Sequence, residues 1–189
     1  KFNNKTNGVT QRRWLLECNT QLAKLIKESI GDGWITDLYE LKKLEIFQDD
    51  PEFLEKLDKA KMWNKERLAK YVKEKLDIVI DPNTLFDIQV KRIHEYKRQL
   101  LNILHVIHLY NEIRAGKHLK VPRTFIFAGK SAPGYRMAKL IIKLINSVAN
   151  VVNNDPIVSK ELKVVFIPNY NVSAAQIIIP AANISEQIS

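Results

Sequence analysis

The sequence has little of several features that define other classes of protein. It contains one cysteine among 189 residues, which excludes an intramolecular disulfide framework and is typical of a reducing compartment. It has no run of about 18 apolar residues, so no membrane span is expected. Lys1 to Lys5 include neither Met nor an apolar leader, so no signal peptide is expected. With no internal repeat or low-complexity segment, these absences favour a cytoplasmic globular protein.

The composition allows one domain, or one domain with a helical attachment. Hydrophobic residues make up 46% of the chain and charged residues 27%, which allows a sizeable core and excludes global disorder. Thirty Lys and Arg against 21 Asp and Glu give a formal net charge of +9. That charge favours anionic partners, namely nucleic acid, anionic lipid, phosphate or phosphorylated metabolites, without choosing among them.

The first third of the sequence reads as helical. Apolar spacing predicts a helix from about Trp14 to Ile30, which Gly31 ends. Thr36-Asp37 can cap a second helix with apolar residues at three-residue steps, and Asp50-Pro51 can open a third. Much of the Lys lies in this third helix, interleaved with acidic residues at helical spacing, so these charges read as a solvated face.

After Asp81 the pattern changes to strands that alternate with helices. Strands are expected at 85–90, 123–128 and 162–167, helices from about 97 to 115 and from 135 to 152, and a short helix or strand at 172–179. The helix from 97 is apolar almost all round, so we expect it to be buried. The order predicts an α/β fold with an open parallel sheet.

Three loops follow the carboxyl ends of the expected strands, where ligands bind in such sheets. They are 91–97, 129–134 and 168–172. The first is strongly cationic, with Lys91, Arg92, Lys97 and Arg98 beside the start of a helix that itself favours anions. A bound phosphate would resolve that conflict, although Glu95 could instead neutralise the loop.

The other candidate motifs are weaker. The loop 129–134 has two glycines, but its Lys follows the first glycine directly, so it is not a nucleotide-binding P-loop and equally fits a tight turn. His105 and His108 lie on a helix without a nearby carboxylate and read as packing residues, and Cys18 has no nearby His to activate it. Only Tyr96 is an aromatic residue among the cations, which disfavours nucleic-acid binding.

Several long motifs resemble those of the α-glucan phosphorylases, the glycogen, starch and maltodextrin phosphorylases. The longest, at 87–102, reads DIQVKRIHEYKRQLLN. Further matching segments, which extend the resemblance over essentially the whole chain, are 4–14, 129–135, 151–156, 169–173 and 179–189. The sequence resembles plant-type members more than animal-type ones, because Asn171 and Pro168 stand where animal-type members have an Arg and an acidic residue.

The resemblance implies a fold, a reaction and partners. It implies part of a glycosyltransferase-B enzyme, with a helical segment at residues 1–80 and the first part of a Rossmann-like C-terminal domain at 81–189. Members use inorganic phosphate to release glucose 1-phosphate from the non-reducing end of an α-1,4-glucan, with pyridoxal phosphate as cofactor. A cytoplasmic homodimer that binds neither nucleic acid nor membranes is implied for the full-length protein.

The resemblance also implies roles for individual residues. Arg92 and Lys97 would hold the substrate phosphate, and Lys91 would lie beside the cofactor phosphate. The remaining assignments are substrate binding for Asn7 and His94, cofactor binding for Trp14, Tyr170 and Asn171, and effector binding for Tyr135. No metal site is implied.

In the family, the lysine that binds the cofactor as a Schiff base follows the segment that residues 179–189 match. None of the lysines in this chain matches that position, so none is expected to bind the cofactor in this way. We therefore expect the 189 residues alone to be inactive. Two alternatives remain open: a non-catalytic sugar-phosphate or glucan-binding module that uses the same cationic loop, and a basic nucleic-acid binder.

Overall fold

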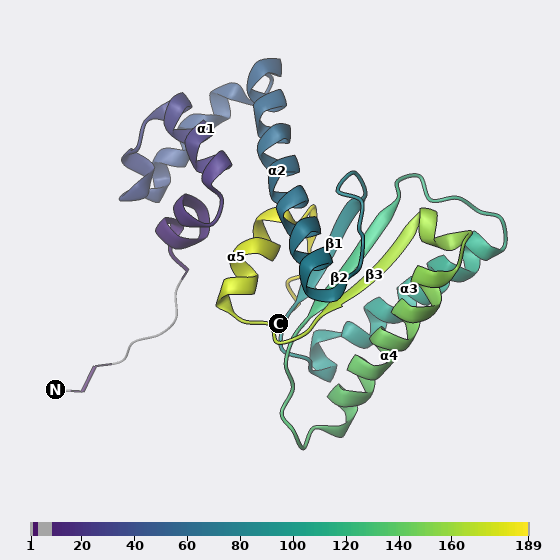
Figure 1. The fold of residues 1–189 in the computed structure, drawn as a ribbon. Helices are drawn as coiled ribbons and strands as arrows, with labels where there is room; N and C mark the ends of the chain where they lie inside the picture. The colour runs from purple at the N-terminus through teal and green to yellow at the C-terminus, as the bar shows by residue number, and fades with distance from the viewer. Residues whose placement is uncertain (1, 4–8, 189) are drawn as a thin grey trace. The chain divides into compact units, whose positions relative to one another are not determined.

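The computed structural model describes residues 2–3 and 9–188 (Figure 1). The chain forms two compact units, Lys1–Asn64 and Lys65–Ser189, and each is described by itself. The contacts divide helix α2 (Pro51–Leu76) between the two units. The domain division expected at residue 80 concerns the whole protein and stays a prediction.

The first unit is helical, as expected, but its helices are less regular than the pattern predicted. The helix expected from Trp14 to Ile30 is a π-helix, Arg12–Glu17, followed after Cys18 and Asn19 by α1 (Thr20–Ile30). Gly31 ends α1 with a φ of +83°, which L side chains rarely adopt. This unit has a small core, formed by the buried residues Ala23, Ile26 and Trp34.

The second predicted helix is a 3-10 helix rather than an α-helix. It spans Leu38–Phe47, after a short 3-10 turn at Gly33–Ile35. Its apolar residues recur every third position, which is the period of a 3-10 helix and lines them up on one face. Asp37 caps it by accepting a hydrogen bond from the Tyr39 N–H at 3.1 Å, so the predicted start signal is confirmed.

The signal for the third helix is also confirmed. The Oδ1 atom of Asp50 accepts hydrogen bonds from the N–H groups of Glu52 at 2.9 Å and Phe53 at 3.2 Å. These two bonds satisfy donors that have no partner within the helix, and they start α2 at Pro51.

The second unit is built on a parallel sheet with the order β3-β2-β1-β4. The three expected strands are present as β1 (Leu85–Val90), β2 (Arg123–Ala128) and β3 (Leu162–Ile167). They pair in register, with Leu85 opposite Arg123 and Arg123 opposite Leu162. The fourth strand, β4 (Ile184–Ser185), was not expected, because two residues are too short for a sequence pattern.

Helices cover both faces of this sheet (Figure 1). The end of α2 and α5 (Val172–Ala181) pack on the face that carries Phe86, Ile88 and Val90. The other face is covered by α3 (Gln99–Arg114) and α4 (Arg136–Asn154), which pack on Phe125 and Phe127. The segment 172–179, for which the sequence allows a helix or a strand, is a helix. The structure thus confirms the α/β fold with a Rossmann-like sheet of parallel strands.

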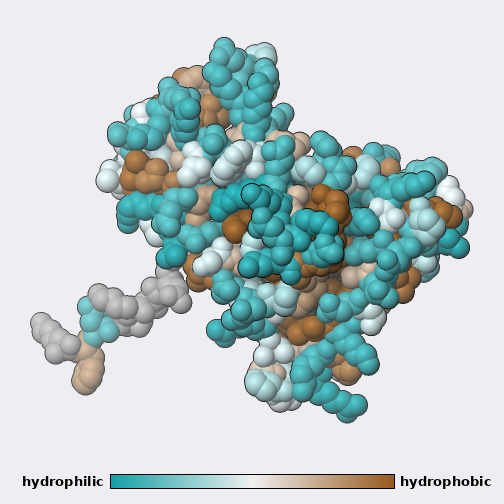
Figure 2. Space-filling model, viewed as in Figure 1, coloured by the Kyte–Doolittle hydropathy of each residue, from teal (hydrophilic) through white to brown (hydrophobic). Residues whose placement is uncertain are grey.

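One expectation about α3 is wrong. Its apolar residues predicted a helix buried on all sides, but Leu101 is 61% exposed and Leu104 49% exposed. Only one face of α3, with Ile103, Val106 and Ile113, packs into the core. The reason is that, within the described residues of the second unit, α3 is an outer layer that other elements cover on one side only. On the face drawn in Figure 2, hydrophobic residues interrupt a mostly hydrophilic surface. No helix in the described part of the chain is long and apolar enough to cross a membrane.

Candidate functional site

The cationic loop lies beside the loop of the neighbouring strand. Because β1, β2 and β3 are parallel and adjacent, the three loops that follow them leave the same edge of the sheet. The pairing of β1 with β2 continues past both strands. The Lys91 N–H donates to the Ala128 carbonyl at 3.1 Å, and the Ile93 N–H donates to the Lys130 carbonyl at 3.0 Å. The expected convergence of the first two loops is therefore confirmed.

Gly129 is required by this close approach. A Cβ atom at this position would lie 2.1 Å from the Lys91 carbonyl oxygen and 2.8 Å from the Ile93 Cδ1 atom. Real Cβ atoms essentially never come within 3.0 Å of such atoms, so no other residue fits without a shift of backbone. The glycine serves the packing of two loops, which agrees with a tight turn rather than a nucleotide-binding loop.

The cations of the first loop are not neutralised by carboxylates. Lys91 and Lys97 are half-buried, and Arg92 and Arg98 are exposed. Within residues 2–3 and 9–188, no carboxylate lies within ion-pairing distance of any of the four. Lys97 lies over the Tyr96 ring, with its Nζ atom 5.5 Å from the centroid. Such a group of unpaired cations can bind a phosphate, with Arg donating two hydrogen bonds and each Lys acting as a point charge.

Glu95, the residue that could have neutralised the loop, faces Tyr135 instead. The Tyr135 hydroxyl donates to the Glu95 Oε2 atom at 2.6 Å and accepts from the Glu95 N–H at 3.2 Å. The bond to the carboxylate is the main reason why the pKa of Tyr135 is raised above its ordinary value. Glu95 therefore does not neutralise the neighbouring cations.

Aromatic rings gather around His94 at the rim of the cationic loop. Its ring lies 4.3 Å from that of Tyr96 and 5.0 Å from that of Tyr135, between centroids. The His94 Nδ1 atom accepts a hydrogen bond from the Tyr96 N–H at 3.4 Å. The structure thus brings together two residues that the sequence singled out, His94 and Tyr135. Nothing in the sequence indicated the hydrogen bond between Glu95 and Tyr135, because it joins residues forty positions apart.

The third loop carries Tyr170 and Asn171. Tyr170 packs against the core on the α2 and α5 side of the sheet, and burial raises the pKa of its hydroxyl. Asn171 caps α5, since its Oδ1 atom accepts from the Ala174 N–H at 3.0 Å. Its Nδ2 atom donates to the Asn169 carbonyl at 3.0 Å. The Asn171 side chain is thus engaged within its own loop.

Two of the expected site residues cannot be joined to these loops. Trp14 belongs to the first unit, where it lies half-buried in the π-helix Arg12–Glu17. Asn7 lies outside the described residues. Both assignments stay predictions.

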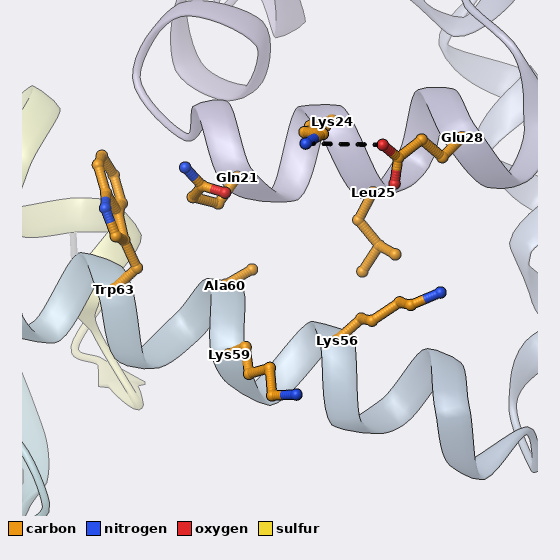
Figure 3. Close-up of a pocket in the computed structure, with 8 residues that line it drawn as sticks. All are labelled: Gln21, Lys24, Leu25, Glu28, Lys56, Lys59, Ala60 and Trp63. Atoms are coloured by element: carbon orange, nitrogen blue, oxygen red, sulfur yellow. Dashed lines mark ion pairs between the residues drawn. The ribbon is translucent and has the colours of Figure 1, made fainter.

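A groove of about 400 Å³ between α1 and α2 in the first unit offers a different kind of surface (Figure 3). Leu25 and Ala60 are buried beneath it, and Trp63 stands at one end. Each of its three lysines is paired with a carboxylate one helical turn away: Lys24 with Glu28 at 3.8 Å, Lys56 with Glu52 at 2.6 Å, and Lys59 with Glu55 at 2.6 Å. Because the charges compensate, this groove does not compete with the cationic loop as an anion site.

Asp87 is a buried carboxylate that the sequence reading missed. It lies in β1 with 5% of its surface exposed, and its Oδ1 atom has no hydrogen-bond partner among the described residues. Arg123 approaches its Oδ2 atom at 3.5 Å. Burial, reinforced by the nearby Glu186 and opposed by Arg123, raises the pKa of Asp87 to about 6. An acidic residue within a strand whose only other polar residue is Gln89 was the available signal.

The chain resembles known phosphorylases along its whole length. Residues 1–189 match the model of the carbohydrate phosphorylase family. The chain is 60% identical to a glycogen phosphorylase of Synechocystis sp., 57% to the liver form of glycogen phosphorylase of Homo sapiens and 55% to the muscle form of Oryctolagus cuniculus. Each comparison covers 100% of this chain and 22% of the relative, so the chain spans about a fifth of these proteins' length. This protein is a member of the carbohydrate phosphorylase family.

Proposed function

We propose that the chain supplies the phosphate-binding loop of an α-1,4-glucan phosphorylase. The full-length protein would use inorganic phosphate to release glucose 1-phosphate from non-reducing ends, as a pyridoxal-phosphate-dependent glycosyltransferase. The observation that carries the proposal is a set of cations without carboxylate partners, among the described residues, at the carboxyl end of a parallel strand. The identity of 55–60% to glycogen phosphorylases supports it.

In this proposal, each of three cations has a separate role. Arg92, which is exposed, offers its planar fork of donors to the substrate phosphate, and Lys97 adds a point charge. Lys91, which is half-buried, would hold the phosphate of the cofactor. Positive charge fixed in place before the phosphate arrives stabilises the negative charge of the reacting groups without reorganisation of solvent.

The residues at the strand ends fit the cofactor in part. When bound, pyridoxal phosphate supplies a phosphate group that exchanges a proton with the substrate phosphate. Lys91 offers this group a cation, and Tyr170 offers a half-buried aromatic wall. Asn171 fits less well as a direct ligand, because its side chain is engaged in the cap of α5. We infer that Asn171 acts on the cofactor by ordering the third loop, while Trp14 lines the pocket.

The remaining assignments concern the sugar, effectors and partners. We infer that Asn7 and His94 contact the glucosyl unit and that Tyr135 stacks on effectors. A cytoplasmic homodimer is the form that the family resemblance implies, with no nucleic-acid or membrane partner. The 189 residues alone should produce no glucose 1-phosphate from maltoheptaose and phosphate, and turnover by this chain would contradict that inference.

The test compares two arginines of the same loop in the full-length protein. Arg92→Lys keeps the charge but loses the bidentate geometry, so kcat/KM for phosphate should fall by about 10²–10³-fold. Arg98→Lys is the matched control and should change it by less than about threefold, because Arg98 is assigned no ligand in this proposal.

If both variants keep the activity of the wild type, the assignment of the phosphate site is wrong. If the wild type binds glucose 1-phosphate or glucan but never turns them over, the chain belongs instead to a non-catalytic binding module that uses the same loop.

A further inference from the structure

Two glutamines beside the cationic loop are almost completely buried. Gln89, in β1, is 1% exposed, and Gln99, the first residue of α3, is 0% exposed. Burying an amide side chain is unfavourable unless its polar atoms form hydrogen bonds. Glutamine in these two interior positions therefore calls for a physical explanation, and its hydrogen bonds provide one.

Gln99 holds the first half of the loop. Its Nε2 atom donates to the Arg92 carbonyl at 3.1 Å, and its Oε1 atom accepts from the His94 N–H at 3.4 Å. The amide thus bridges the backbone on both sides of Ile93, whose own side chain is buried. Its orientation is determined, because only the nitrogen can donate to a carbonyl.

Gln89 holds the second half in the same way. Its Nε2 atom donates to the Lys97 carbonyl at 2.9 Å, and its Oε1 atom accepts from the Asn102 Nδ2 atom at 3.0 Å. Asn102, one turn into α3, therefore orients the amide that holds Lys97. Each of the two residues assigned to the substrate phosphate has its backbone carbonyl bound by a buried glutamine.

We propose that Gln89 and Gln99 are positioning residues that preset the backbone of the cationic loop for phosphate binding. The inference rests on the proposed function, because it takes Arg92 and Lys97 as the phosphate ligands. Neither amide needs to touch the phosphate. They act through the two backbone carbonyls that they hold, and so through the side chains attached there.

The loop needs these hydrogen bonds because it contains little regular secondary structure of its own. Between β1 and α3 it forms only one short 3-10 turn, Glu95–Lys97, and Arg98 then adopts a φ of +60°. Its cations repel one another when no anion is present. A binding geometry fixed in advance avoids ordering the loop at each binding event, and misplacement of a ligand by about 1 Å can cost 10²-fold in rate. Buried amides with satisfied hydrogen bonds supply that fixed geometry.

The test uses Gln99→Met in the full-length protein, which keeps the apolar volume but removes both hydrogen bonds. We expect the KM for inorganic phosphate to rise by about 10–100-fold, while the KM for maltoheptaose changes by less than about twofold. Gln89→Met should act in the same direction. Thr124→Val is the matched control, since Thr124 is also fully buried and bonds the Thr84 hydroxyl at 2.7 Å, at the other end of the strands. It should leave the KM for phosphate unchanged.

A second variant keeps the proposal testable if Gln99→Met does not fold. Gln99→Glu keeps the acceptor for the His94 N–H but donates to the Arg92 carbonyl only when its carboxyl group is protonated. Its KM for phosphate, relative to wild type at the same pH, should therefore recover as the pH falls. A ratio that does not change with pH would contradict a role in positioning.

The outcomes separate this inference from the proposed function. If Arg92→Lys weakens phosphate binding but Gln99→Met and Gln89→Met do not, the glutamines are structural only and the inference fails. It fails as well if Thr124→Val raises the KM for phosphate as much as the glutamine variants do. If Arg92→Lys has no effect either, the proposed phosphate site itself is wrong.

Discussion

Replacing Gly129 by alanine tests whether the close packing of two loops sets the geometry of the cationic site. The added methyl group would lie 2.1 Å from the Lys91 carbonyl oxygen, so these atoms must separate by about 0.9 Å to reach 3.0 Å. The carbonyl cannot move freely, because the N–H groups of Lys91 and Ile93 on either side of it are bonded to the carbonyls of Ala128 and Lys130, at 3.1 and 3.0 Å. The shift must therefore break or strain this backbone pairing.

The expected loss of stability is about 3 kcal/mol. Overpacking of a tight site typically costs about 1–3 kcal/mol, and the weakening of one of the two hydrogen bonds adds about 1 kcal/mol. For a protein of this size the loss corresponds to a fall in Tm of about 6–12 °C. Because the strain falls beside Arg92, kcat/KM for phosphate in the full-length protein should also fall by about 10²-fold.

Gly134→Ala in the same loop is the control. A Cβ atom at Gly134 would meet no atom of the described residues within 4 Å, so this change should alter the free energy of unfolding by less than about 0.5 kcal/mol. Urea unfolding and initial-rate kinetics measure the two effects. If Gly129→Ala has the same unfolding midpoint and the same phosphate kinetics as Gly134→Ala, the reasoning from close approach is refuted.

Two further predictions concern the sheet and the helix that covers it. Asp87→Asn should raise the free energy of unfolding by about 1–2 kcal/mol at pH 7.5. The full elevation of its pKa, from 3.8 to about 6, corresponds to about 3 kcal/mol, and the loss of the attraction between Asp87 and Arg123 in the variant reduces this gain. The pKa of Asp87 is higher in the folded state than in the unfolded state, so the wild type loses stability as the pH rises from about 4 to 6. The stability advantage of Asp87→Asn should therefore vanish near pH 4. Urea titrations in which the gain in stability does not depend on pH would contradict this. On α3, Leu101→Gln should change the free energy of unfolding by less than about 0.5 kcal/mol, whereas Ile103→Ala should lower it by about 2–4 kcal/mol. Thermal unfolding of the 189-residue chain measures both effects. Equal losses of stability in the two variants would mean that Leu101 is buried.

The sequence was sufficient to predict the three long strands and the edge of the sheet that carries the cationic loop. Strands 85–90, 123–128 and 162–167 occur where predicted, because short apolar runs bounded by turn residues satisfy both the local preference and the burial of a parallel strand. Gly31 and Asp50 mark helix ends as expected, because their effect is local to a turn or a cap. The parallel order itself places the three loops at one edge.

Local patterns were insufficient where packing decides between similar conformations. Residues 38–47 have the three-residue spacing of a 3-10 helix, yet spacing alone did not separate this from an α-helix. The apolar residues of α3 did not reveal that Leu101 faces outward, because exposure depends on how many layers cover a helix and not on its composition.

The arrangement around the cationic loop depends on contacts that the sequence does not encode locally. The sequence determined which residues are charged, which can hydrogen-bond and which loop follows which strand. Only the tertiary structure decided that Glu95 bonds Tyr135, that Gly129 faces the Lys91 carbonyl and that Gln99 is buried beneath the loop. The physical reason is that hydrogen bonding and steric fit act over a few ångströms in space, and the fold brings together atoms that lie far apart along the chain.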